Sequence, residues 1–211
     1  MAEEKYWNKY YGEGSGEVSA PVVPSQFAAF VATEFSRERP VIVEIGCGNG
    51  RDSLSFAGWG FDVVGTDASS AAIDLCQSKA PENASFLCSE IEDPGLAAKL
   101  ADAVGDRTAL VYARFFIHAI DEQAEADFFR VAKTLCGEAG SVAVEFRTDR
   151  DEAIAKVTPS HYRRFVSPAG FLKRAVLAGF EASYFAEGFG YAKFRHDDAH
   201  VARFILKPHS G

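Results

Sequence analysis

Apolar residues follow two different patterns along this chain, and the patterns alternate from about residue 40 to the C-terminus. Short runs of β-branched residues are typical of buried strands, whereas apolar residues three or four positions apart are typical of helices. The short runs predict strands at Val41–Ile45, 61–66, Ala84–Cys88, 108–113 and 141–146. The helical spacing predicts helices at 51–58, 69–79, 123–135 and 167–178, and two later runs predict a strand pair at 181–185 and 201–206.

This alternation favours parallel strands joined by crossover helices on both faces of one sheet. We therefore predict an α/β fold with a doubly wound, mostly parallel, seven-stranded sheet that ends in an antiparallel strand pair. Strands four and five are expected at its centre. No repeat or linker interrupts the pattern, so residues 39–211 are interpreted as the core of a single domain.

Residues 1–38 have a different character and are predicted to form an N-terminal helical cap. An aromatic cluster comes first, and it consists of Tyr6, Trp7, Tyr10 and Tyr11. An amphipathic helix is predicted at 25–35, because its apolar residues share one side. We expect this segment to pack outside the sheet as a lid over the ligand edge, where it would exclude water.

Charge and cysteine content narrow the function classes. The 211 residues carry a formal net charge of −8, which disfavours a nucleic-acid partner or an anionic membrane surface. Cys47, Cys76, Cys88 and Cys136 lack zinc-ligand spacing, so we expect buried thiols in a reducing compartment and no metal. No apolar stretch approaches the roughly 20 residues of a membrane span, and no signal-peptide pattern follows Met1. A cytoplasmic protein is expected.

The strongest chemical feature is the stretch EIGCGNG at residues 44–50, directly between the first strand and a helix. Its three glycines permit a tight turn and bring backbone N–H groups against a ligand. The dinucleotide-binding fingerprint would need its third glycine at position 51, which is Arg51. A P-loop would need Lys and Ser or Thr where Arg51 and Asp52 stand. Both departures disfavour a ligand held by its phosphates.

Two carboxylates point to a positively charged ligand instead. Glu44, beside the loop, would repel pyrophosphate but suits an ammonium or sulfonium group. Asp67 ends the second strand, where a carboxylate can accept hydrogen bonds from both ribose hydroxyls. A cationic nucleoside without phosphates satisfies both features, and S-adenosylmethionine is such a molecule.

The stretch VIVEIGCGNGRDSLSFAGWGFDVVGTDASSAAIDLC, residues 41–76, resembles motifs I and II of the Rossmann-like class I S-adenosylmethionine-dependent methyltransferases. The resemblance extends over about residues 41–150 and implies S-adenosylmethionine as cofactor and S-adenosylhomocysteine as product. The resemblance implies that Glu44 supports the loop and that Asp67 binds the ribose. The residues that it places at the methionine end of the cofactor are Gly46, Cys47, Gly48, Gly50, Ala113 and Arg114. Those that it places at the adenine are Ala68, Ser89, Glu90 and Ile91. Such families usually have Asp where Glu90 stands, so the charge is kept on a longer side chain.

The acceptor should lie beyond the fourth strand, because ligands of doubly wound sheets bind outside the carboxyl ends of the strands. Residues 113–118 end in His118, which resembles an apolar-x-x-x-Leu-His pattern of many small-molecule methyltransferases. His118 is interpreted as a general base, a substrate hydrogen-bond donor, or a residue bonded to backbone, and His161 is a second candidate base.

Arginines concentrate at the same edge, which predicts an anionic acceptor, since guanidinium groups bind carboxylate or phosphate with two hydrogen bonds. The predicted substrate-binding set is Tyr11, Arg114, His118, Arg147, His161 and Arg163, with His118 and His161 as the catalytic candidates. Tyr11 would place its ring near the sulfonium. Alternatively, the arginines pair with the local acids Glu145, Asp149, Asp151 and Glu152.

Together these features predict methyl transfer from S-adenosylmethionine to a small, anionic acceptor bearing a carboxylate or phosphate. An ionised acceptor oxygen needs no base, whereas an alcohol, phenol or protonated amine does. The expected partner is the small-molecule acceptor, with no nucleic acid and no membrane, and the chain is expected to be a monomer or homodimer.

Four alternatives stay open, one of which is a protein-modifying enzyme. The first is an NAD(P)-dependent oxidoreductase, and the second is a protein that uses the same pocket for binding, assembly or other chemistry. The third is a nucleic-acid methyltransferase, although no Asn/Asp-Pro-Pro-aromatic motif follows the fourth strand and no Pro-Cys nucleophile is present.

Overall fold

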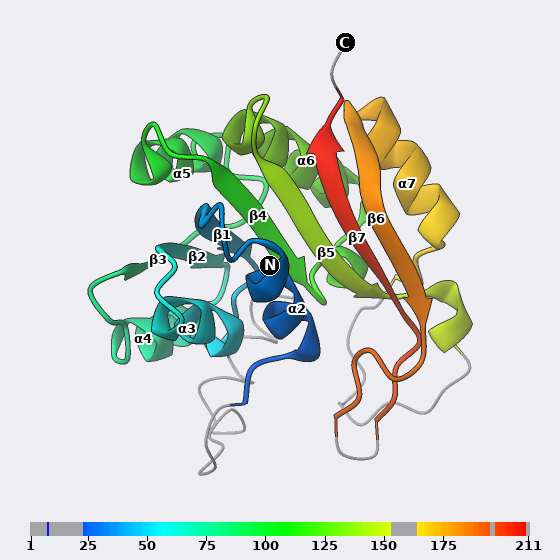
Figure 1. The fold of residues 1–211 in the computed structure, drawn as a ribbon, viewed down its shortest axis with the longest axis horizontal. Coiled ribbons are helices and arrows are strands. Elements are labelled where there is room, and N and C mark those ends of the chain that lie inside the picture. The colour runs from blue at the N-terminus through cyan, green and yellow to red at the C-terminus, as the bar shows by residue number, and fades with distance from the viewer. Residues whose placement is uncertain (1–7, 9–22, 153–163, 195–196, 210–211) are drawn as a thin grey trace.

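One seven-stranded sheet organises the described part of the chain (Figure 1). The computed structural model describes residues 8, 23–152, 164–194 and 197–209. The strands are β1 Val41–Ile45, β2 Val63–Asp67, β3 Ala84–Cys88, β4 Ala109–Arg114, β5 Ser141–Arg147, β6 Phe180–Gly188 and β7 Val201–Pro208. Their order is β3-β2-β1-β4-β5-β7-β6. The first five are parallel, and β7 runs antiparallel to both β5 and β6. This confirms the predicted fold class and its terminal strand pair.

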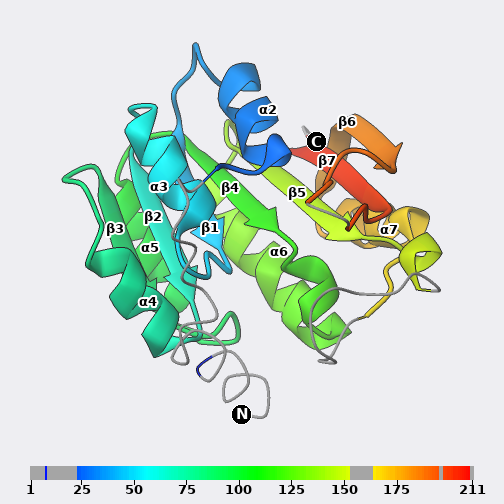
Figure 2. The ribbon, with the colours of Figure 1, turned by 90° about the horizontal axis from the view of Figure 1, so that it is seen from below.

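Helices cover both faces of the sheet (Figures 1 and 2). They are α2 Gln26–Glu34, α3 Arg51–Gly58, α4 Ser70–Gln77, α5 Leu96–Val104, α6 Glu122–Cys136 and α7 Pro168–Leu177. Buried residues of α2 and α3 pack on one face, and those of α5, α6 and α7 pack on the other. Helix α5 was not predicted from the sequence. It begins after Gly95, which provides no side-chain cap.

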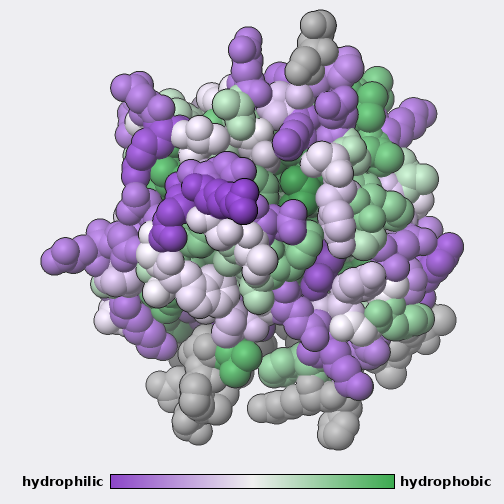
Figure 3. Space-filling model, in the orientation of Figure 1, coloured by the Kyte–Doolittle hydropathy of each residue, from purple (hydrophilic) through white to green (hydrophobic). Residues whose placement is uncertain are grey.

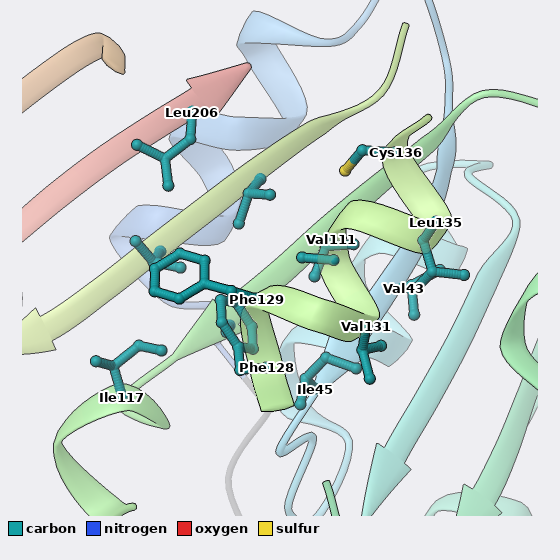
Figure 4. Packing of buried hydrophobic residues seen from close by; sticks show 14 of the residues in the cluster. Val43, Ile45, Val111, Ile117, Phe128, Phe129, Val131, Leu135, Cys136 and Leu206 are labelled. Atoms are coloured by element: carbon teal, nitrogen blue, oxygen red, sulfur yellow. The ribbon is translucent and has the colours of Figure 1, made fainter. Parts of the chain in front are cut away.

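The larger core lies between α6 and the sheet (Figure 4). Phe128 and Val131 of α6 pack against Val43 of β1 and Val111 of β4, all of them buried. Each such side chain contributes roughly 1.5–3 kcal/mol when it leaves water. Because side chains alternate along a strand, the residues next to these in β1, β4 and β5 face α2 and α3 instead. Several of those residues are charged, and they lie at the carboxyl ends of the strands.

The exposed large apolar residues of the described chain are Val23, Trp59, Val176, Leu177, Phe185, Phe189 and Phe194. On the face seen in Figure 3, hydrophilic residues surround smaller apolar areas. Among the residues that the structure describes, no helix has both the length and the apolar character needed to cross a membrane.

Candidate functional site

The loop between β1 and α3 carries three glycines in the left-handed region. Their φ angles are 75° at Gly46, 54° at Gly48 and 77° at Gly50, which side chains with a Cβ rarely adopt. A Cβ on Gly46 would lie 2.5 Å from Cδ2 of Phe116, and a Cβ on Gly50 would lie 2.8 Å from Sγ of Cys76. Glycine is therefore required for both conformational and steric reasons at the carboxyl end of β1.

Asp67, at the end of β2, is bonded directly to this loop. One carboxylate oxygen accepts from the Gly48 N–H at 2.9 Å, and the other accepts from the Ser69 N–H at 2.9 Å. Burial raises the pKa of Asp67, and the two backbone hydrogen bonds partly offset that effect. A carboxylate oxygen has two lone-pair positions, so each oxygen of Asp67 keeps one for a further donor. The side chain can thus hold the loop and a diol together.

The start of α4 lies beside Asp67 and contacts the N-terminal segment. Ser69 caps α4, because its hydroxyl accepts from the Ala72 N–H. The same hydroxyl donates to Oδ1 of Asn8 at 2.7 Å. Asn8 therefore lies at the carboxyl edge of the sheet. Its neighbours, including Tyr11, are outside the described residues.

The end of β3 completes this side of the site. Strand register sets Cys88 beside Asp67, and the Ser89 N–H donates to the Asp67 carbonyl at 3.0 Å. Glu90 is exposed in the following turn. Ile91 is buried in the larger core, so little of its side chain can border a ligand.

Two other members of the predicted cofactor set also have buried side chains. Cys47 packs with Ile73 and Cys76 in a small cluster under the loop, and Ala113 lies in the larger core. Their backbone can border a ligand, but their side chains are part of the packing. Ala68 is half-buried next to Asp67.

Glu44 is placed differently from the expectation that it pairs with a cation. Its side chain is buried beneath α3, where the Ser53 hydroxyl donates to it. No ion pair joins it to a lysine or arginine of the described residues. Burial, and then the neighbouring Asp52 carboxylate, raise the pKa of Glu44 well above its ordinary value. This geometry favours a protonated side chain that supports the loop.

Asp52, the second residue of α3, joins three elements. It accepts from the Ser25 N–H at 2.9 Å, the Ser25 hydroxyl at 2.7 Å and the Tyr112 hydroxyl at 2.8 Å. Burial alone would raise the pKa of Asp52, but Arg51, Arg114 and the bonds from Ser25 lower it overall. An ionised Asp52 thus ties the start of α2 to α3 and to β4.

A row of charged residues crosses three strands on the α2 face. Register sets Arg114 of β4 opposite Glu145 of β5, and Glu145 opposite Arg203 of β7. Nε of Arg114 donates to Oε1 of Glu145 at 2.8 Å, and Nε of Arg203 donates to Oε2 at 2.7 Å. Arg203 also donates to the Tyr191 carbonyl at 2.7 Å and lies 5.2 Å from the Phe27 ring centroid. Two guanidinium groups thus share one fully buried carboxylate.

Phe115 follows β4 in an unusual backbone conformation. Its φ is 59°, a region that costs an aromatic residue free energy and that clusters at functional sites. The Arg114 guanidinium lies 4.0 Å from its ring centroid and that of Arg147 lies 5.4 Å away. The turn directs the chain from β4 past the glycine loop, where Phe116 covers Gly46.

Arg147, predicted to clamp the acceptor, is instead paired within the protein. Nη1 donates to Asp151 at 2.7 Å and Nη2 donates to Asp197. The side chain is buried, so the local-acid interpretation holds for this arginine. Its predicted partners in the clamp, His161 and Arg163, lie outside the described residues.

His118 is buried just beyond β4, and its Nδ1 accepts from the Arg147 backbone N–H at 3.1 Å. A neutral imidazole that accepts at Nδ1 carries its proton on Nε2. A proton taken up at Nδ1 would break the bond to Arg147. The geometry therefore supports a hydrogen-bond donor at Nε2 and disfavours a general base.

Sequence reasoning missed Arg203, Tyr112, Ser25 and His200. The hydroxyl of Thr148 and Nδ1 of His200 lie 2.7 Å apart in a buried contact. A charged residue inside an apolar strand was the available signal for Arg203. Nothing local identifies its partners.

Comparisons with known proteins agree with this architecture. Residues 42–140 match the family described as a methyltransferase domain. A solved S-adenosylmethionine-dependent methyltransferase from Anabaena variabilis is 20% identical with a TM-score of 0.74, and the match covers 99% of this chain and 94% of that one. The CcbJ methyltransferase from Streptomyces caelestis is 16% identical with a TM-score of 0.73, covering 98% and 99% of the two chains. The DhpI–SAH complex is 16% identical with a TM-score of 0.64, covering 99% and 96%. No curated protein matches the chain. At these identities the structural likeness shows the fold.

Proposed function

From a class I methyltransferase fold and the match of residues 42–140 to a methyltransferase domain, we propose that the chain transfers a methyl group from S-adenosylmethionine. The proposed acceptor is a small molecule bearing a carboxylate or phosphate. The observation that carries the cofactor assignment is the bond from Gly48 to Asp67. It joins the glycine loop to a carboxylate that can still accept two donors.

The residues present fit the cofactor. Asp67 would accept from the two ribose hydroxyls through the lone pairs that Gly48 and Ser69 leave open. The glycine loop, whose backbone turns at positive φ, would border the methionine end. Glu90, exposed one residue beyond Ser89, would accept from the adenine amino group.

Arg114 is the residue we assign to the anionic acceptor. It stands at the carboxyl end of β4, beside the loop after β1, where ligands of such sheets bind. Burial alone would lower the pKa of its guanidinium, but Glu145 and Asp52 raise it overall, so the group stays charged. Its Nε donates to Glu145, and among the described residues no acceptor lies within hydrogen-bond distance of its terminal nitrogens.

The proposed chemistry is an in-line displacement. When bound, the cofactor supplies a methyl carbon that forms a bond to the acceptor oxygen while its bond to sulfur breaks and the electron pair stays on sulfur. Arg114 holds an acceptor that is already ionised, so no residue has to remove a proton. Such alignment alone can supply about 7 kcal/mol.

Calorimetry with S-adenosylmethionine and S-adenosylhomocysteine tests the cofactor assignment. The wild-type protein should bind both, and Asp67→Asn should bind at least tenfold more weakly, because it loses charge-assisted hydrogen bonds worth about 1.5–3 kcal/mol. Asp62→Asn is the matched control, since Asp62 pairs with Arg107 on the surface. A folded protein that binds neither ligand would overturn the proposal.

A panel of small carboxylates and phosphate monoesters tests the acceptor class, with release of S-adenosylhomocysteine as the readout. Arg114→Gln should lower kcat/KM for these acceptors more than it lowers the affinity for S-adenosylhomocysteine. Turnover of neutral amines alone would refute the anionic acceptor. Cofactor binding without any turnover would favour the alternative in which the pocket serves binding or assembly.

A further inference from the structure

The row formed by Arg114, Glu145 and Arg203 has one more positive than negative charge. Two other charged groups lie beside the row. Asp52 pairs with Arg51, whose Nε lies 3.2 Å from its carboxylate. Arg147 pairs with Asp151 and Asp197, so that group has one more negative than positive charge. Within the row itself, one positive charge is unmatched.

The two ends of the row differ in how far they are closed. Arg203 has a side chain only 6% exposed, donates to both Glu145 and the Tyr191 carbonyl, and lies 5.2 Å from the Phe27 ring centroid and 4.9 Å from that of Tyr191. The Arg114 side chain is 13% exposed and, among the described residues, has the ring of Phe115 against one face. An anion can reach the row at Arg114, whereas Arg203 is enclosed by protein.

We propose that Arg203 and Glu145 set the charge of the acceptor site and thereby determine its specificity for an acceptor with a negatively charged group. This inference rests on the proposed function and deepens it. Neither residue touches the acceptor. Glu145 alone would neutralise Arg114. Arg203 shares that carboxylate and so leaves the Arg114 end with a net positive charge.

This arrangement gives the two residues opposite effects. Removing the charge of Arg203 leaves a neutral Arg114–Glu145 pair, so anions should bind more weakly. Removing the charge of Glu145 leaves two unshared cations, so anions should bind more tightly. A residue that only supported the fold would weaken binding in both cases.

The test titrates benzoate or inorganic phosphate onto protein saturated with S-adenosylhomocysteine, followed by NMR or calorimetry at low salt. At an effective dielectric constant near 20, one charge about 10 Å from the anion changes affinity about tenfold. We expect Arg203→Gln to weaken anion binding about tenfold and Glu145→Gln to strengthen it about tenfold. The difference between the variants should shrink at high salt.

The chain contains a matched control on its opposite face. Arg164 and Arg174 share the buried carboxylate of Glu125, and Nη1 of Arg164 also lies 3.8 Å from the exposed carboxylate of Glu122. Arg174→Gln and Glu125→Gln should leave anion affinity unchanged. Arg203→Lys keeps the charge and should keep the affinity, which separates charge from packing if Arg203→Gln folds poorly.

The outcomes separate this inference from the proposed function. Loss of S-adenosylhomocysteine binding by the wild type would refute the function itself. Normal binding of that ligand, with anion affinity shifted in the same direction by Arg203→Gln and Glu145→Gln, would refute the inference alone. Anion binding that is equally sensitive to Arg174→Gln would refute it as well.

Discussion

Two arginine centres lie at the same edge of the sheet and have opposite charge balances. The Arg114 centre comprises Arg114, Glu145 and Arg203, with two cations on one carboxylate. The Arg147 centre comprises Arg147, Asp151 and Asp197, with two carboxylates on one cation. The ring of Phe115 contacts an arginine of each.

This difference in charge balance determines which of the two arginines could pair with an added anion. Arg147 is buried with its charge more than balanced, so it holds β5 to the segments that follow it. Arg114 shares its counter-ion with Arg203, so the positive charge of this centre is only partly balanced. Two arginines close in space thus have different tasks, because their neighbours differ in number and sign.

The largest expected effect on stability comes from replacing Arg147, and the matching change in the other centre replaces Arg114. Arg147→Gln leaves two buried carboxylates without a cation and should lower the free energy of unfolding by about 3–5 kcal/mol. Arg114→Gln leaves Glu145 paired with Arg203 and should cost only about 1 kcal/mol. Urea denaturation followed by circular dichroism measures both. Equal losses would contradict the difference between the centres.

When a carboxylate is removed instead of an arginine, the Arg114 centre should lose more stability than the Arg147 centre. Glu145→Gln leaves two largely buried guanidinium groups without a carboxylate and should cost about 2–3 kcal/mol. Asp151→Asn should cost about 1 kcal/mol, because Asp197 still pairs with Arg147 and Asn still accepts from the His200 N–H. The same denaturation series checks this. A larger loss for Asp151→Asn would show that the charge counts do not govern stability here.

Glu44 is a further buried carboxyl group, and no arginine of the described residues forms an ion pair with it. Because its pKa is raised in the folded state, the unfolded chain releases this proton at lower pH, and stability falls as pH rises above the ordinary pKa of Glu. Glu44→Gln keeps an acceptor for Ser53 and removes this loss. We expect it to be more stable than wild type at neutral pH by on the order of 1 kcal/mol. The gain should vanish near pH 4, and a pH-independent difference would contradict the raised pKa.

The smallest effect concerns the backbone of Phe115, between the two centres. Phe115→Gly and Phe115→Ala both remove the ring, but only Gly adopts a positive φ without strain. Phe115→Gly should therefore be the more stable variant by about 1 kcal/mol. Thermal unfolding of the pair measures the difference. If Phe115→Ala proves equally stable, the conformation is not strained.

Much of the fold could be predicted because its determinants are local. Strand and helix periods, the glycine loop and the position of Asp67 at a strand end can all be recognised within short windows of sequence. Helix α5 was missed although Leu96, Leu100 and Val104 have helical spacing, since its N-cap Gly95 offers no side-chain cap. The spacing of apolar residues thus indicated helix α5, but no capping residue marked where it begins.

Within the site, the sequence by itself determined the turn that needs glycine and the carboxylate that follows β2. Only the tertiary structure decided which charges remain unmatched. Arg114, Glu145 and Arg203 lie 31 and 58 residues apart in successive steps, and they meet because β7 runs antiparallel to β5 in one particular register. Residue types fix how many charges a chain carries. Long-range strand pairing fixes which of them neutralise one another, because Coulomb interactions depend on distance in space and on burial.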